Sequence, residues 1–485
     1  MTKIARHIED LADELISDIL FFLLPSDNLS ATSSPVNFLD LSPGLNGRPA
    51  HVYGEQTELD RFRLVCKRFL RISTPKKFTR FHLRFSRRGF RRLEELMHWQ
   101  LACHVKHFTY LVRPFYQESG WSQFLAELDS SDFPIVGTHR TRLQDQMLIL
   151  DSNHDGELLK KAMAAFSSLR QVKLLRLQDQ AHERLLDYLC ERSLEGSLSL
   201  NWEPACTRAM TNLGTSLLAS SRTSVGFIGP QIDPRATIKL LQTPSTTLFA
   251  IGARLTSLEI TFYANLSLTS YIGELSQVFH DFFLAAKNLE IIHLGFATTV
   301  PVDLSLEQVF HRIQWKRLRK LSIQWLMVTS PEIISLIRRH RRQLRDIRLV
   351  NIFLHNEGRW RDVLSVLHDE MDAIEHIDLR GINYASYIDG VAGNNGPGSS
   401  YAMGHNDSNG SGNSLQHQAP LNTDYLAFAL SGLPRHMLST PIPEGIRNLS
   451  VNDLGDDGTY VTYAQRQLWE AWVLSSPRWS ARRRN

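Results

Sequence analysis

Apolar residues recur along this chain in a pattern that predicts alternating strands and helices. A six-residue frame, apolar-x-x-apolar-x-apolar, has starts separated by 34, 29, 26 and 30 residues, at Leu255, Leu289, Leu318, Leu344 and Ile374. Apolar stripes with helical spacing lie between these frames, and Ser330-Pro331-Glu332 predicts the N-cap and first turn of one such helix. Strand and helix alternating at this period predict a solenoid in which each repeat buries its apolar face on the next.

Further frames extend this pattern toward both ends of the chain and make it irregular. They begin at Val105, Leu169 and Ile446, and the interval after Leu169 has room for two degenerate units near 197–200 and 225–228. The frame is similar to that of leucine-rich repeats, but the usual Asn or Cys eight residues after the first leucine is replaced by Tyr263, Ala297, Leu326, Ile352 and Ile382. We therefore expect an α/β fold, an irregular leucine-rich-repeat-like solenoid with a curved parallel sheet. A generic α/β domain is the alternative.

Two amphipathic helices are predicted near the N-terminus. In the first, Leu11, Leu15, Ile19 and Phe22 form one apolar stripe that Asp10 can cap and Pro25 ends. The second is predicted from about Glu58 to Ile72, with its apolar residues on one side: Leu59, Phe62, Val65, Cys66 and Phe69. An ordinary pair of packing helices would show the same periodicity.

The residues of these two helices resemble an F-box in detail. The first helix has Leu11, Glu14, Leu15, Asp18, Ile19 and Leu20, and the second contains Arg63-Leu64-Val65-Cys66-Lys67-Arg68-Phe69. Ala12 replaces the proline usual in the family, and residues 26–57 make the connection longer than usual. With the strand-helix region that follows, the chain resembles the F-box proteins of fungi.

This resemblance implies a function in ubiquitin-dependent protein degradation, without chemistry of its own. The chain would be the substrate-recognition subunit of a cullin-RING (SCF-type) E3 ubiquitin ligase, and its solenoid would hold an unknown target protein. The F-box would dock on a Skp-type adaptor and through it on a cullin, with contacts from Leu11, Leu15, Ile19, Leu20, Leu64, Val65, Cys66 and Phe69. Exposed candidates for contact with the target are Arg319, Gln324, Arg345 and Arg348. An F-box scaffold without ligase function is an alternative.

The patterns divide the chain into successive regions. We expect an F-box at 8–75 with a loop insertion at 26–57, a solenoid at 76–383 with an insertion at 113–157, a disordered Gly/Asn/Ser-rich insertion at 384–440, a last repeat with a C-terminal helix at 441–478, and a basic tail at 479–485. The domain order is therefore a docking end followed by a recognition end.

Positive charge is concentrated in one segment. Residues 61–93 contain 13 Lys and Arg and no Asp or Glu, although the net charge of the chain is only +4. This segment raises the alternative of a nucleic-acid-binding protein. However, Phe81, Leu83 and Phe85 alternate with basic residues as in a half-buried strand, and Ser86 can cap a following helix. We therefore favour a solvated face of folded structure and do not expect nucleic acid as a partner.

Motifs for chemistry are weak throughout the sequence. The four cysteines are scattered, and Asp151–Gly156 matches only half of a calcium loop, since Ala162 occupies the position of the bidentate Glu. The group His98, Cys103, His104 and His107 has spacing that does not suit zinc. We expect no catalytic residues, no metal and no cofactor. No apolar run is long enough to span a membrane, so we expect the protein in the cytoplasm or nucleus.

Overall fold

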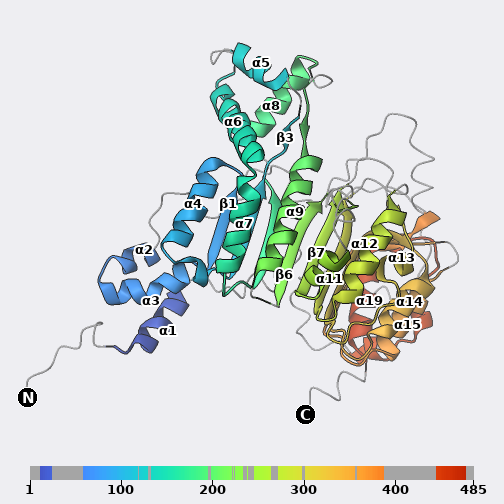
Figure 1. Ribbon diagram of the computed structural model, residues 1–485. Helices are drawn as coiled ribbons and strands as arrows, with labels where there is room; N and C mark the ends of the chain where they lie inside the picture. The colour runs from blue at the N-terminus through green and yellow to red at the C-terminus, as the bar shows by residue number, and fades with distance from the viewer. Residues whose placement is uncertain are drawn as a thin grey trace, which may run out of the picture.

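The computed structural model describes residues 11–23, 58–117, 120–128, 133–177, 179–194, 198–220, 222, 224–232, 237–238, 245–263, 271–297, 301–355, 358–386 and 444–476. These residues form a small helical unit at the N-terminal end, a long sheet covered by helices, and a projecting helical lobe (Figure 1). The predicted loop at 26–57, nearly all of the insertion at 384–440 and the tail at 479–485 lie outside the described residues.

The sheet is parallel and follows the chain order almost without exception. Its main path comprises β1 (Arg80–Arg84), β2 (His107–Val112), β4 (Gln171–Arg176), β6 (Val225–Ile232), β7 (Leu255–Tyr263), β8 (Ile291–Ala297), β10 (Lys320–Val328), β11 (Asp346–Leu354) and β12 (His376–Asp378). Two short strands, β9 (Val302–Asp303) and β13 (Asn383–Tyr384), pair with β10 and β11. The predicted mixed α/β fold with a large parallel sheet is confirmed.

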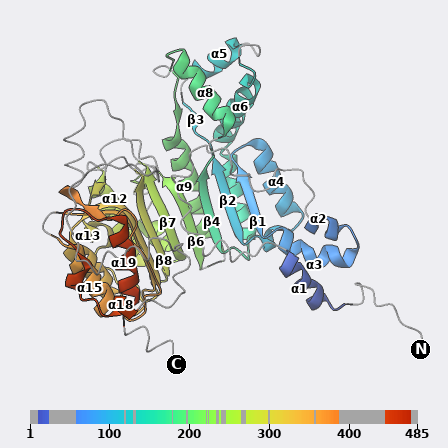
Figure 2. The same cartoon turned by 180° about the vertical axis from the view of Figure 1, so that it is seen from behind.

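Helices follow most strands and cover one face of the sheet. They are α4 (Arg87–His98), α7 (His154–Ala165), α9 (Trp202–Ala219), α11 (Ser245–Gly252), α12 (Ile272–Ala285), α13 (Leu306–Phe310), α14 (Ser330–Arg339) and α15 (Trp360–Asp369). Seen from behind, the strands β1 to β8 lie in front of these helices, so that their other face is open (Figure 2). Among the described residues, the strands β1 to β8 therefore have their helices on one face (Figure 2).

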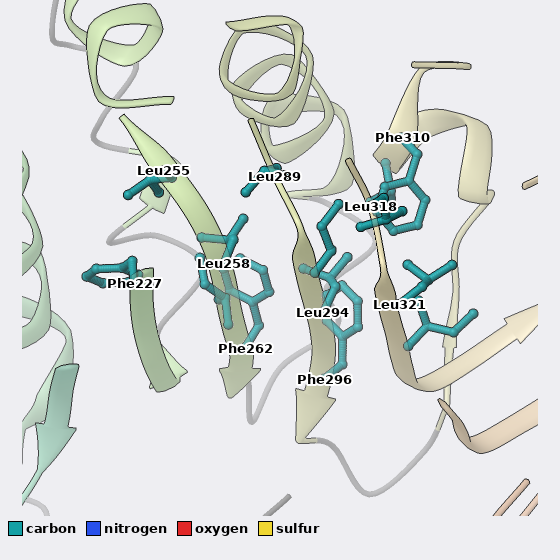
Figure 3. Packing of buried hydrophobic residues seen from close by; sticks show 14 of the residues in the cluster. Phe227, Leu255, Leu258, Phe262, Leu289, Leu294, Phe296, Phe310, Leu318 and Leu321 are labelled. Atoms are coloured by element: carbon teal, nitrogen blue, oxygen red, sulfur yellow. The ribbon is translucent and has the colours of Figure 1, made fainter. Parts of the chain in front are cut away.

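The six-residue frame recurs because its second apolar residue, at the fourth position, faces the helices in each strand. These positions are paired in register across the sheet as Phe81, Phe108, Val172, Phe227, Leu258, Ile292, Leu321, Ile347 and Ile377. Each is buried, and the row packs with the neighbouring apolar positions into one continuous core (Figure 3). Side chains alternate between the two faces of a strand. Only every second residue of a strand therefore has to be apolar for the helix-covered face to be apolar.

One predicted helix start agrees with the structure and two are shifted. The first helix begins at Asp13, three residues after the predicted cap Asp10. Ser86 caps α4 as predicted, since its hydroxyl accepts a hydrogen bond from the Gly89 N–H. The N-cap of α14 is Thr329, one residue before the predicted Ser330. Thr329 and Glu332 form a capping box, in which each side chain bonds the backbone of the other residue. The capping box explains the shift, because the acid then falls at the third helical position.

Three other predicted elements are wrong. The single helix predicted over 58–72 is two helices, α2 (Glu58–Arg63) and α3 (Lys67–Lys77), separated at the extended Cys66. The strand predicted at Ile446 is replaced by α18 (Glu444–Arg447) and a 3-10 turn over Val451–Leu454. Residues 198–200 form no repeat strand, since β5 (Leu200–Asn201) pairs antiparallel with β3 (Phe115–Tyr116) away from the main sheet. One unit, β6, therefore separates β4 from β7.

The helical lobe is built from α5 (Gly120–Glu127), α6 (Val136–Ser152) and α8 (Gln180–Glu191) beside β3 and β5 (Figure 1). It has a separate apolar core around Trp121 and Leu185. The predicted insertion at 113–157 thus contributes α5 and α6, but α8 and β5, from beyond β4, belong to the same lobe. The lobe is therefore made from two inserts that flank one repeat.

The C-terminal end of the sheet is closed by α19 (Tyr463–Leu474), the predicted C-terminal helix. Trp472 stacks on His368 of α15 with ring centroids 4.1 Å apart. The carboxylate of Glu470 accepts a hydrogen bond of 2.7 Å from the Leu379 N–H, just after β12. The helix thereby provides a hydrogen-bond acceptor for a backbone N–H just after the last strand, and it shields the edge of the sheet from pairing with another strand.

Candidate protein-docking surface

The helical unit, defined as α1 (Asp13–Leu23), α2 and α3, has a small apolar core. Its fully buried apolar side chains are Ile16, Leu20, Leu59 and Phe69. The rings of Phe62 and Phe69 stack with centroids 4.3 Å apart. This core joins α1 to α3 although more than 30 residues separate them in the sequence, an arrangement that loop closure penalises only weakly.

Charged contacts fix the same two helices against each other. The carboxylate of Asp13 accepts hydrogen bonds of 2.6 Å from Arg68 and from Arg71. The bond from Arg68 is the main reason that the pKa of Asp13 lies below its usual value. Farther along, Lys76 of α3 donates to the Ser17 carbonyl. The orientation of α1 on α3 is therefore set at two points.

Cys66 makes the turn that precedes α3. Its backbone is extended, and its Sγ accepts a hydrogen bond of 3.5 Å from the Phe69 N–H, so the thiol caps the helix. The two residues before it, Leu64 and Val65, lie in the turn after α2 and are 75% and 60% exposed. The turn therefore holds two large apolar side chains in solvent.

A second pair of exposed apolar side chains lies on α1. Leu15 is 52% exposed and Ile19 is 38% exposed, whereas the adjacent Ile16 and Leu20 are buried. Positions four apart share one face of a helix, so Leu15 and Ile19 form a stripe on the outer face. Two pairs of large apolar side chains are thus left in water within one small helical unit, which makes the unit a candidate for contact with another protein.

The eight residues predicted to contact an adaptor thus occupy different places. Leu15, Ile19, Leu64 and Val65 are exposed, and we call these four the docking surface. Leu11 and Cys66 are half-buried, while Leu20 and Phe69 lie inside the unit and support the surface from below. Leu70, which is 43% exposed on α3, was not in the predicted set. Leu70 lies within the helix that the sequence predicted over 58–72. Its spacing of four residues from Cys66 is the signal that could have identified it.

The candidate target contacts also divide. Arg319 and Arg345 are exposed, and Arg345 pairs with Glu375 at 2.8 Å. Arg348 is only 8% exposed and bonds the Asp346 carboxylate at 3.1 Å on the open face of the sheet. Arg348, together with His376, holds the pKa of Asp346 well below its usual range despite burial. Arg348 is therefore a structural partner of Asp346, and Gln324 beside it is half-buried.

A further polar cluster lies at the base of the lobe. Asp179 caps α8 and accepts hydrogen bonds from Arg113 and Arg142 at 3.1 and 2.6 Å. Nearby, His139 bonds the Tyr116 hydroxyl at 2.8 Å and the Ala181 carbonyl at 3.0 Å, and burial lowers its pKa to about 4. Both ring nitrogens of this histidine are engaged within the lobe, and Arg113, which directly follows β2, joins Asp179 to the sheet.

The weak metal motifs form no site in the structure. Asp155, from the half calcium loop, is fully buried and accepts hydrogen bonds from Arg208 at 2.6 and 2.8 Å and from Asn212 at 2.8 Å. The described part of the chain contains no group of three or more His, Cys, Asp or Glu placed to hold a metal ion. Asp155 instead joins α7 to α9.

Comparisons with known proteins assign no family. The chain matches no model of a known protein family, and it matches no curated protein. Among the described residues, none of the helices has the length and apolar character required to cross a membrane.

Proposed function

We propose that this chain is the substrate-recognition subunit of an SCF-type ubiquitin ligase. In this proposal, the helical unit binds a Skp-type adaptor and the strand-helix repeats hold a target protein. The observation that supports it most is the docking surface of Leu15, Ile19, Leu64 and Val65, which belongs to the same two segments that resemble an F-box. Burial of these side chains in a partner would remove apolar area from water, which favours association.

The role of the protein would be to position its partners. A receptor that holds a target beside a ubiquitin-loaded enzyme raises the effective concentration of the target lysine. The parallel sheet supports this role, because one continuous core extends from β1, the first strand after the helical unit, to β12 at the far end. Targets bound at different repeats would therefore be held on one continuous body.

Capture of a purified Skp-type adaptor by the full-length chain tests the proposal. We expect capture by the unmodified protein and its loss in the double variant Leu15→Asp and Leu64→Asp, since buried unpaired carboxylates oppose association. The matched control is Leu148→Asp with Leu284→Asp, which changes two leucines that are 45% and 44% exposed on α6 and α12. Retained capture in the first variant, or equal loss in both, would contradict the proposed surface.

A second experiment separates a ligase subunit from a scaffold. Proteins captured with the full chain and the adaptor are incubated with the cullin, ubiquitin and its activating and conjugating enzymes. Ubiquitylation of a captured protein that requires the docking surface supports the ligase. Stable capture without ubiquitylation supports the scaffold. Steeply salt-dependent binding of DNA or RNA, lost when the arginines of 61–93 are neutralised, would instead support the nucleic-acid alternative.

A further inference from the structure

A hollow lined by arginines lies where α14 turns into β11. It has a volume of about 220 Å³ and is lined by Gln314, Arg338, Arg339, Arg341, Arg342 and Gln343, which we call the arginine hollow. Residues 311–345, which surround it in the sequence, include ten Lys and Arg but a single acid, Glu332. That acid lies in the first turn of α14, at the opposite end of the helix from the hollow.

Two of the four guanidinium groups are already neutralised. Arg338 makes a bidentate contact with Glu370 at 2.6 and 2.8 Å. Arg339 bonds Glu307 at 3.0 Å through one terminal nitrogen, while its Nη1 atom is buried with no hydrogen-bond partner in the described residues. Carboxylates from the repeats on either side therefore hold these two arginines in place.

The other two guanidinium groups have no carboxylate partner in the part of the chain that the structure describes. Arg341 and Arg342 are exposed in the turn after α14. Four guanidinium groups thus face two carboxylates around one hollow, which leaves an excess of positive charge. Guanidinium is planar and weakly hydrated, and its fork of N–H donors matches the oxygens of phosphate.

The walls of the hollow are fixed by contacts below it. Gln314 donates to the Arg339 carbonyl at 2.9 Å, and Gln343 donates to the Trp315 carbonyl at 2.9 Å. Between these contacts, the buried ring of His340 stacks on Trp315 with centroids 5.5 Å apart. The turn that carries Arg341 and Arg342 is therefore anchored on both sides, so binding there would order little additional backbone.

We propose that the arginine hollow binds a phosphate-type anion, with Arg341 and Arg342 as its principal ligands and the buried Nη1 atom of Arg339 as a further donor. The group could be part of a free polyphosphate compound or a phosphate ester on another protein, since both present the same oxygens. This site is separate from the docking surface and does not depend on the proposed ligase function.

Calorimetric titration of the full-length chain tests the site, at constant ionic strength in chloride buffer. The probes are sodium pyrophosphate and a Gly/Ser peptide with two phosphoserines. The peptide is compared with its unphosphorylated counterpart. We expect saturable binding of at least one probe, weakened about tenfold or more in Arg341→Gln with Arg342→Gln, because the variant loses two charged hydrogen-bond donors to the anion. Tighter binding of pyrophosphate indicates a free compound, and tighter binding of the phosphopeptide indicates a protein.

The matched control removes two adjacent exposed arginines elsewhere, in Arg87→Gln with Arg88→Gln at the start of α4. It should bind within about twofold of the unmodified protein if the hollow is specific. Circular dichroism checks that both variants are folded. Equal weakening in the two double variants, no saturable binding of either probe, or binding only to long DNA would overturn the proposal.

Discussion

The helical unit and the strand-helix repeats place their apolar side chains differently. In the repeats, one apolar row continues across nine strands and every member is buried against helices. In the helical unit, four apolar side chains form the core, while Leu15, Ile19, Leu64 and Val65 remain exposed. The repeats satisfy their apolar surface by stacking on each other, whereas no described part of the chain covers these four side chains of the helical unit. This difference indicates where a partner would bury apolar surface.

The largest effect on stability is expected for a buried aromatic residue of the repeats. Trp360 is fully buried at the start of α15, and its Nε1 donates to the Asn383 carbonyl at 3.0 Å. Trp360→Ala should lower the free energy of unfolding by about 3–5 kcal/mol, because it leaves a cavity and an unpaired carbonyl. Urea denaturation measures this loss. Trp99→Ala, which removes a 68% exposed side chain, is the control. Comparable losses of stability in the two variants would contradict the conclusion that burial in the repeat core causes the loss.

The next effect concerns the core of the helical unit itself. Leu20 is 2% exposed on α1, and Leu20→Ala should destabilise this unit by about 2–3 kcal/mol. Hydrogen exchange of the α1 and α3 amides locates the loss, which we expect there and not in the sheet. Increased exchange throughout the sheet would show that the helical unit and the repeats unfold together, and the contrast between them would then be weaker.

The repeats could be predicted from the sequence because burial and alternation act together in them. The second and third apolar residues of each frame are two positions apart and so share the face that the helices cover, and regular spacing distinguished true strands from chance matches. The frame at Ile446 has the same apolar spacing, yet its Ile446 anchors a short helix against α19. Three apolar residues in six fit a helical turn as well as a strand, so the pattern alone could not decide.

The docking surface could be predicted only in part. The resemblance identified the two segments, but an amphipathic stripe does not show which of its residues pack inside. Leu15 and Ile19 are on the predicted stripe and Leu20 is not, yet the structure exposes Leu15 and Ile19 and buries Leu20. The break at Cys66 was also not predicted, because a thiol that caps a helix is not a common start signal. The arginine hollow requires residues from two repeats and is visible only in the fold.

Mild acid, between pH 7 and 5, should affect the repeats more than the helical unit, because the lowered pKa of Asp13 keeps its carboxylate ionised in this range. Burial lowers the pKa of His340 to about 4, with the charge of Arg339 acting in the same direction. Its Nδ1 bonds the Leu336 carbonyl and its Nε2 accepts from the Trp315 N–H, so the neutral ring fits this site. The described residues of the helical unit contain no histidine. Acid therefore has a specific group to act on in the repeats.

The sign of the pH effect follows from this lowered pKa. Between about pH 6.5 and 4, the unfolded chain binds a proton at His340 that the folded protein does not bind, so stability falls as pH falls. The free energy of unfolding should drop by about 1–2 kcal/mol between pH 7 and 5 from this residue. His340→Gln should reduce the slope of stability against pH, with the exposed His98→Gln as the control. An unchanged slope would contradict this assignment.

The smallest effect on stability is expected at the docking surface, and it is the sharpest test of the comparison. Leu15→Ala removes a leucine from the same helix as Leu20, but its side chain is already half in water, so stability should change by less than about 0.5 kcal/mol. If a partner buries this side chain, the same substitution should weaken adaptor binding about tenfold, as deletion of a buried anchor does at other interfaces. Surface plasmon resonance measures the affinity, and urea denaturation measures the stability. A stable variant with weakened binding would separate the two roles of α1, whereas unchanged affinity would show that exposure of Leu15 has no bearing on the adaptor.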